Sequence, residues 1–183
     1  MNTPANSPAG TVQRHVVFSH GKDSGPWGSK ITALAETARS EGYNVESVDY
    51  QGIDSPEDRI AKLADACKTL QGELVLVGSS LGGYVSLASA ALLHVRALFL
   101  MAPAIYVPGL APLRANAFDC PIALVHGWRD EVVPVEHSIR FAREHGASLI
   151  LVQDDHRMHR SIRQIRHAFE YFLISIDLPE PLV

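Results

Sequence analysis

The stretch LVLVGSSLGG, residues 74–83, decides the fold that the rest of the chain adopts. A run of β-forming residues leads into a serine framed by glycines, and a stretch rich in Ala, Ser and Leu follows. This order predicts a buried strand, a very tight turn and a helix. Gly78 and Gly82 allow the strand and the helix to pass closely, because neither residue carries a Cβ atom.

The turn itself has the pattern Gly-x-Ser-x-Gly, with Ser80 at its centre. In a nucleophile elbow, a strained turn of this kind lifts the serine oxygen clear of the backbone. The pattern is short, so the evidence for a nucleophile elbow comes mainly from the apolar strand before the turn and the helix after it. The alternative is a glycine-rich turn between strand and helix that has no catalytic role.

Segments typical of strands and helices alternate on both sides of this turn. Strands are predicted at residues 15–19, 43–49, 74–77, 95–101, 121–125 and 148–152. Helices are predicted from Pro26, from Ser55, from Ser80 to about residue 93, from Pro134, and around Ile162. Mostly apolar strands that alternate with helices predict an α/β fold, a three-layer α/β/α sandwich around a mostly parallel six-stranded sheet.

Composition limits the possible classes of function. The 183 residues are 46% hydrophobic and 20% charged, and the net charge of −4 gives no support for nucleic acid or a membrane surface as partner. Residues 1–13 are polar and are expected to form a flexible tail without a secretory leader pattern, and residues 14–183 a single domain without a large lid. Cys67 and Cys120 show no disulfide or metal pattern, which fits the reducing cytoplasm.

Polar residues follow several of the predicted strands. Ser80 follows the strand at 74–77, Asp130 follows the strand at 121–125, and His156 follows the strand at 148–152. The carboxyl ends of parallel strands lie along one edge of a sheet, so these side chains are expected to meet. Serine, acid and histidine in this chain order form a serine triad, in which histidine removes the hydroxyl proton and the carboxylate orients the histidine.

These motifs resemble those of the α/β-hydrolase superfamily, and they are most similar to its small, lidless serine hydrolases. The matching stretches are residues 20–27, 49–52, 78–83, 126–134 and 155–156, so the resemblance covers nearly the whole chain from His15. The first two strands of the family have no counterpart before His15, which implies a trimmed sheet of six strands. Gln153 and Asp154 stand where many relatives have glycines.

The resemblance also implies a role for each residue of the site. It implies Ser80 as nucleophile, Asp130 as acid and His156 as base. The same match implies that the backbone N–H groups of Leu81 and Lys22 bind the oxyanion.

The residues leave some assignments open. Glu131 is the alternative to Asp130 as acid, and His159 is the alternative to His156 as base. The two histidines and the aspartates before them can also be interpreted as metal ligands. Four aromatic residues near the strand ends either line a substrate pocket or pack in the core: Trp27, Tyr84, Tyr106 and Trp128.

The sequence therefore predicts a serine hydrolase that cleaves a small or medium ester or thioester through an acyl-enzyme. No metal and no organic cofactor is expected, and the expected partner is a small-molecule ester or thioester. The alternatives are a binding or scaffold protein that keeps the fold without turnover, and a peptidase or lyase that uses the same triad. The acyl group and the oligomeric state are left open.

Overall fold

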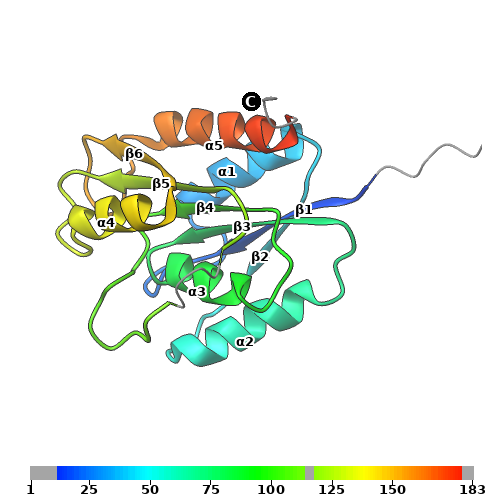
Figure 1. Cartoon of the computed structure of the whole chain (residues 1–183), viewed down its shortest axis with the longest axis horizontal. Coiled ribbons are helices and arrows are strands. Elements are labelled where there is room, and N and C mark those ends of the chain that lie inside the picture. Colours follow the sequence, from blue (N-terminus) through cyan, green and yellow to red (C-terminus); the bar gives the residue numbers. More distant parts are fainter. Residues whose placement is uncertain (1–11, 114–117, 179–183) are drawn as a thin grey trace, which may run out of the picture.

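The computed structural model describes residues 12–113 and 118–178 (Figure 1). Nearly all of the predicted tail, residues 1–13, lies outside the described residues. The strands of the described part are β1 (Arg14–Ser19), β2 (Asn44–Val48), β3 (Glu73–Ser79), β4 (Ala97–Met101), β5 (Ile122–Gly127) and β6 (Ser148–Val152). Its helices are α1 (Ser29–Ser40), α2 (Pro56–Cys67), α3 (Leu81–Ala90), α4 (Val135–His145) and α5 (Ile162–Asp177).

The strands form one sheet in the order β2-β1-β3-β4-β5-β6. Each neighbouring pair is parallel, so the predicted parallel six-stranded sheet is confirmed. Strand β3, which leads into Ser80, lies inside the sheet between β1 and β4. Its residues 74–79 are buried, as expected for a strand covered on both faces.

Helices cover both faces of the sheet, which confirms the predicted three-layer sandwich (Figure 1). One hydrophobic cluster joins the sheet to α1 and α5, and a second joins it to α2, α3 and α4. Side chains of neighbouring strand residues point to opposite faces, so each strand can contribute to both clusters. In β1, for example, Val16 and Phe18 belong to the first cluster and Val17 to the second.

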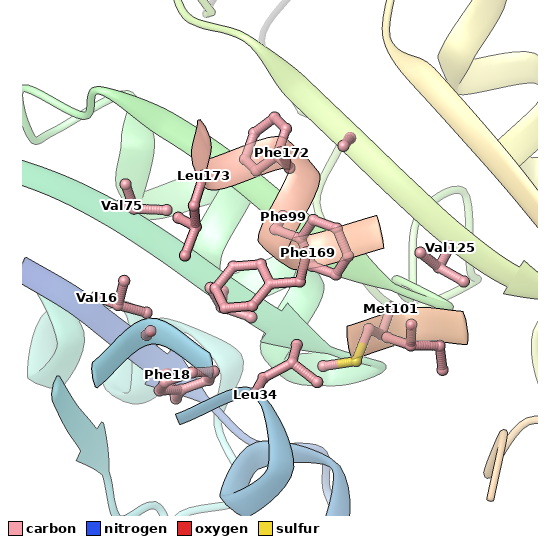
Figure 2. Close-up of a cluster of buried hydrophobic side chains, with 14 of the residues drawn as sticks. Val16, Phe18, Leu34, Val75, Phe99, Met101, Val125, Phe169, Phe172 and Leu173 are labelled. Carbon is pink, nitrogen blue, oxygen red and sulfur yellow. The ribbon is translucent and has the colours of Figure 1, made fainter. Parts of the chain in front are cut away.

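Phe169 is a fully buried residue of α5 that lies against the sheet (Figure 2). Its ring centroid lies 4.9 Å from that of Phe99 in β4 and 6.5 Å from that of Phe18 in β1. All three rings are fully buried. These aromatic contacts hold α5, and with it the loop before α5, on the sheet.

Local sequence signals explain where one helix begins and why another begins late. The Ser55 hydroxyl accepts a hydrogen bond from the Asp58 N–H at 3.1 Å, and Pro56 occupies the first position of α2. In contrast, α1 begins at Ser29 and not at Pro26. Gly28 is extended, and the Trp27 side chain is 48% exposed, so the predicted helical pattern starts three residues late.

The segment between β4 and β5 contains no helix or strand among its described residues, as its prolines predict. Residues 114–117 of this segment lie outside the described part. No helix within residues 12–113 or 118–178 combines the length and the apolar character that crossing a bilayer requires.

Candidate active site

Ser80 has backbone torsions of φ 55° and ψ −122°, which side-chain-bearing residues rarely adopt. Such strain persists only when the surrounding structure imposes it. The Ser80 N–H donates to the Met101 carbonyl at 3.0 Å, and the Ser80 carbonyl accepts from Gly83 N–H at 2.9 Å and Ala104 N–H at 3.0 Å. Strand β4, helix α3 and the loop after β4 therefore hold this serine in the conformation of a nucleophile elbow.

The glycines around Ser80 are required by close backbone contacts. A Cβ atom on Gly82 would lie 2.0 Å from the Ser19 carbonyl oxygen, and one on Gly78 would lie 2.4 Å from the Gly82 carbonyl oxygen. No side chain fits at these distances. The structure thus has the close passage of strand and helix that the sequence predicts.

Asp130 and His156 are joined by a hydrogen bond of 2.6 Å between Asp130 Oδ2 and His156 Nδ1. The Asp130 side chain is fully buried, while His156 remains 19% exposed. The second carboxylate oxygen, Oδ1, accepts from the N–H groups of Val132 and Val133, both at 2.8 Å. His126 Nε2 also lies 3.0 Å from Asp130 Oδ2.

The ionisation of Asp130 follows from these contacts. Burial by itself raises the pKa of the Asp130 carboxyl, but hydrogen bonds from His126, His156, Val133 and Val132 outweigh it and hold that pKa well below its usual value. Asp130 is therefore a carboxylate at neutral pH and can accept a hydrogen bond from the Nδ1–H group of His156. Glu131, the alternative acid, is exposed to solvent.

The two candidate histidines have different surroundings. His156 bonds Asp130 through Nδ1, which leaves its Nε2 atom available to a hydroxyl group. His159 Nε2 lies 3.5 Å from the Ser29 hydroxyl on α1. The pairing with the buried carboxylate is thus made by His156. Ser80 Oγ has no hydrogen-bond partner among the described residues, and such catalytic contacts often tighten only when substrate binds.

The aspartates next to His156 are occupied by backbone contacts. Asp154 accepts hydrogen bonds from the N–H groups of Asp155 and Ser161, both at 2.9 Å, and so ties the loop to the start of α5. Across residues 12–113 and 118–178, no group of three or more His, Cys, Asp or Glu side chains is arranged to hold a metal ion.

The loop after β1 is held by a buried network of polar groups. The Gly21 carbonyl accepts from His20 Nδ1 at 2.7 Å and from the Arg59 guanidinium of α2 at 3.4 Å. His20 Nε2 accepts from the Tyr50 N–H at 2.8 Å, so the hydrogen of the neutral ring is on Nδ1. In a trans peptide C=O and N–H point in opposite directions, so the Lys22 N–H points away from Arg59.

This loop lies directly beside the elbow. A Cβ atom built on Gly21 would lie 3.4 Å from the Cβ of Ser80. Within the described part of the chain, neither the Lys22 N–H nor the Leu81 N–H donates to another protein group. Two open N–H groups near a serine are what an oxyanion requires.

Comparison with known proteins identifies the family of the chain. The family model described as the alpha/beta hydrolase family matches residues 16–181. The chain belongs to this family. The crystal structure of a hydrolase of the alpha/beta superfamily from Xanthomonas campestris is similar to this chain. The two sequences are 35% identical, and the structures align with a TM-score of 0.83 over 89% of this chain and 99% of the other.

Two further relatives are more distant from this α/β hydrolase. The mouse palmitoyl-protein thioesterase ABHD10, mitochondrial, is 25% identical over 78% of this chain and 69% of its own length. A second Xanthomonas campestris protein, described as a serine hydrolase without lid, is 22% identical, with a TM-score of 0.69 over 96% of this chain and 88% of its own. At that identity the second structure is evidence for the shared fold alone.

The four aromatic residues predicted to line a pocket of this α/β hydrolase have different settings. Trp27 and Trp128 are about half exposed, at 48% and 47%. Tyr84 is buried, and its hydroxyl donates to a backbone carbonyl between β4 and β5 at 3.2 Å. Tyr106 lies against α4, where its hydroxyl donates to Glu144. The pocket assigned to these residues stays a prediction.

Three residues next to the site of this α/β hydrolase carry little signal in the sequence. Lys30 of α1 donates from Nζ to the His156 carbonyl at 3.4 Å, and burial lowers its pKa to about 8 although Asp130 raises it. Arg59 of α2 supports Gly21. His126 precedes a glycine at a strand end, which is typical of a residue that builds a turn; its spacing of four residues from Asp130 is the signal that could have found it.

Proposed function

We propose that this α/β hydrolase is a serine esterase or thioesterase that forms an acyl-enzyme on Ser80. The observation that supports the proposal most is the strained Ser80 at the same sheet edge as the hydrogen-bonded Asp130–His156 pair. A protein that only binds a ligand has no need to store strain at a serine or to ionise a buried acid beside a histidine.

In the proposed first step, Ser80 Oγ attacks the carbonyl carbon of the ester while its proton moves to His156 Nε2. The Asp130 carboxylate stabilises the resulting imidazolium through its bond to Nδ1. The carbonyl oxygen becomes an oxyanion that accepts hydrogen bonds from the Leu81 and Lys22 N–H groups. Each such donor typically lowers the barrier by about 3 kcal/mol.

In the second step, the tetrahedral intermediate breaks the bond to the leaving group, which receives the proton from His156 and departs as an alcohol or thiol. Water then attacks the acyl group on Ser80, and His156 takes a proton from the water and returns it to Ser80 Oγ. The products are a carboxylic acid and free enzyme. Neither step requires a metal ion or an organic cofactor.

The proposed substrate is a small or medium ester or thioester. The named activity of the mouse relative, a palmitoyl-protein thioesterase, supports the thioester side of this proposal. The half-exposed Trp27 and Trp128 after β1 and β5 support a site that is open to solvent. We propose a small molecule as partner, and neither nucleic acid nor a membrane, in line with the net charge of −4.

We also propose that the protein works in the cytoplasm. Cys67 and Cys120 are both free thiols, and burial raises the pKa of each to about 11. The two cysteines form no disulfide, which agrees with a reducing compartment.

Labelling with a fluorophosphonate probe tests the proposed nucleophile. The wild type is expected to gain one probe adduct on Ser80, and Ser80→Ala is expected to lose labelling by about 1,000-fold or more because the attacking oxygen is gone. The adjacent serine provides the matched control, since Ser79→Ala is expected to label like the wild type. A folded wild type that takes up no probe, or a Ser80→Ala variant that labels normally, would contradict the proposed role of Ser80.

A pair of substrate series then separates the two ester classes. Oxygen esters and thioesters with the same acyl chains, from short to long, are hydrolysed side by side by the wild type and by Ser80→Ala. The chain length at which the wild-type rate falls reports the depth of the acyl site. Binding without turnover in both series contradicts an enzymatic role and indicates a binding protein.

A further inference from the structure

We infer that His126 is a positioning residue of the proposed triad, which together with Ser138 fixes the Asp130 carboxylate in the orientation that His156 needs. This inference rests on the proposed function. It gives a role in that function to a buried histidine that has no hydrogen bond to Ser80.

His126 is completely buried near the end of β5, and each of its ring nitrogens has a partner. Nε2 lies 3.0 Å from Asp130 Oδ2 and 3.0 Å from the Val133 carbonyl oxygen. Nδ1 lies 2.7 Å from the Ser138 hydroxyl on α4. The imidazole therefore connects the loop that carries the acid to the helix that follows it.

The position of the ring hydrogen follows from these partners. A carbonyl oxygen can only accept, so the Nε2 atom that contacts Val133 must carry a hydrogen. In the neutral ring, Nδ1 is then an acceptor, and the Ser138 hydroxyl donates to it. The Val133 carbonyl thus selects the tautomer of His126 that carries its hydrogen on Nε2, where Asp130 Oδ2 is also within reach, and the Ser138 hydroxyl adapts to it by donating to Nδ1.

Asp130 consequently accepts from two donors on each of its oxygens. Oδ1 takes the N–H groups of Val132 and Val133, and Oδ2 takes His126 and His156. Rotation of the carboxylate would break several of these bonds at once. Without His126, the oxygen that faces His156 loses its second donor, and the carboxylate is then held by His156 and by the two N–H groups on Oδ1.

The two imidazoles also compete for the same oxygen atom. A donor from His126 draws negative charge from Oδ2 and weakens the stabilisation of a charged His156 ring. Removal of His126 therefore favours the imidazolium, and the acidic limb of the pH–rate profile moves to higher pH. Lys30 of α1 donates to the His156 carbonyl, and Asp154, Asp155, Arg157 and His159 lie within three residues of His156 in the chain; these groups are the same in all variants.

The test compares His126→Phe, His126→Gln and Ser138→Ala with the wild type, with the rate of fluorophosphonate labelling followed from pH 5 to 9. His126→Phe is expected to react about 10- to 100-fold more slowly, with an acidic limb about half a pH unit or more higher. His126→Gln retains an N–H donor and is expected to recover most of the rate and the original limb. Ser138→Ala keeps the Nε2 donor but removes the hydroxyl that holds Nδ1, and it is expected to fall between the wild type and His126→Phe in both rate and acidic limb.

Matched controls separate this role from a general loss of packing. His15→Phe removes a buried histidine near the start of β1 that bonds the Gln71 carbonyl, at the opposite end of the strands from the site. Ser89→Ala removes a buried hydroxyl of α3 that has no partner among the described residues. Both controls are expected to have the same acidic limb in the pH–rate profile as the wild type, even where their stability differs from it. If His126→Phe does not fold, His126→Gln and Ser138→Ala carry the comparison.

Each outcome decides a separate question. A wild type that labels on Ser80, with His126 and Ser138 variants that match it in rate and acidic limb, overturns the role of His126 and leaves the proposed function standing. The role of His126 is likewise overturned when His126→Gln is as slow as His126→Phe. A folded wild type that does not label overturns the proposed function and this inference with it.

Discussion

Lys30 contacts the loop of the proposed base directly. Its ammonium group donates to the His156 carbonyl, and Asp130, Asp155 and Asp154 all favour its charged form. Burial has the larger effect and lowers the pKa of Lys30 to about 8. The charge on Lys30 therefore lowers the stability of the folded protein.

We predict that Lys30→Met raises the free energy of unfolding by about 1–2 kcal/mol at pH 7, after allowance for partial solvent exposure. The folded-state pKa of about 8 lies below the unfolded value near 10.5, so the unfolded chain binds more protons between these values. Wild-type stability thus rises with pH through this window. The advantage of Lys30→Met is expected to shrink from pH 8 to pH 10.

Urea unfolding of both proteins from pH 7 to 10 checks this prediction. Lys62→Met on α2 serves as the control, because Lys62 is exposed and is expected to change stability by less than about 0.5 kcal/mol at any pH. A difference between wild type and Lys30→Met that stays constant over the whole range would contradict the titration of Lys30.

At this scale, the sequence was informative where chemistry coincides with a strand end. Ser80, Asp130 and His156 could be selected because parallel strands bring their carboxyl ends together. Lys30 and Arg59 could not, since a polar residue in a helical pattern ordinarily indicates a solvated face. Their burial depends on which loops cover α1 and α2, and no local pattern contains that information.

Among the elements, the junction of β3 and α3 tolerates little change. We predict that Gly82→Ala lowers the free energy of unfolding by about 3 kcal/mol or more and slows the labelling of Ser80. The reason is that its Cβ would lie 2.0 Å from the Ser19 carbonyl of β1, so α3 must move away from the sheet. Thermal unfolding and probe labelling measure the two effects.

Gly28→Ala is the matched control for that substitution. A Cβ on Gly28 meets nothing closer than 3.8 Å, and this glycine precedes α1 in an extended conformation. Its stability and labelling are expected to equal those of the wild type. Equal losses in the two variants would show that the contact with Ser19 is not the cause.

The elements themselves were predictable from hydrophobic periodicity, and β6 has the bounds that the pattern predicts. Helix starts were predictable where a side chain supplies the cap, as at Ser55, and were misplaced where the backbone alone decides, as at Gly28. The helix after Ser80 ends at Ala90, a few residues before the predicted end near residue 93. Such ends depend on tertiary contacts more than on propensity.

At the scale of the whole molecule, stability depends on two clusters that share one sheet. Phe169→Ala is predicted to lower the free energy of unfolding by about 3–5 kcal/mol, because it empties the centre of the contact between α5 and the sheet (Figure 2). Chemical denaturation measures the loss. Tyr171→Ala on the same helix, where the side chain is 74% exposed, is expected to change it by less than about 0.5 kcal/mol.

The layered architecture was predictable as a whole, since apolar strands alternating with amphipathic helices have few other ways to bury their surfaces. The order β2-β1-β3-β4-β5-β6 was not predicted. Strand order depends on pairings between residues far apart in the chain, such as Arg14 with Glu73. Local sequence patterns do not specify such pairings.

The pairing of β4 with β5 joins two parts of the chain that hold different shares of the proposed chemistry. The part before this seam carries Ser80 and both proposed oxyanion donors, and the part after it carries Asp130 and His156. A polypeptide that breaks off after β4 therefore presents a serine with no base to activate it. Under the proposed mechanism, an unfinished chain is therefore expected to be inactive toward esters until synthesis has delivered the last strands to the sheet.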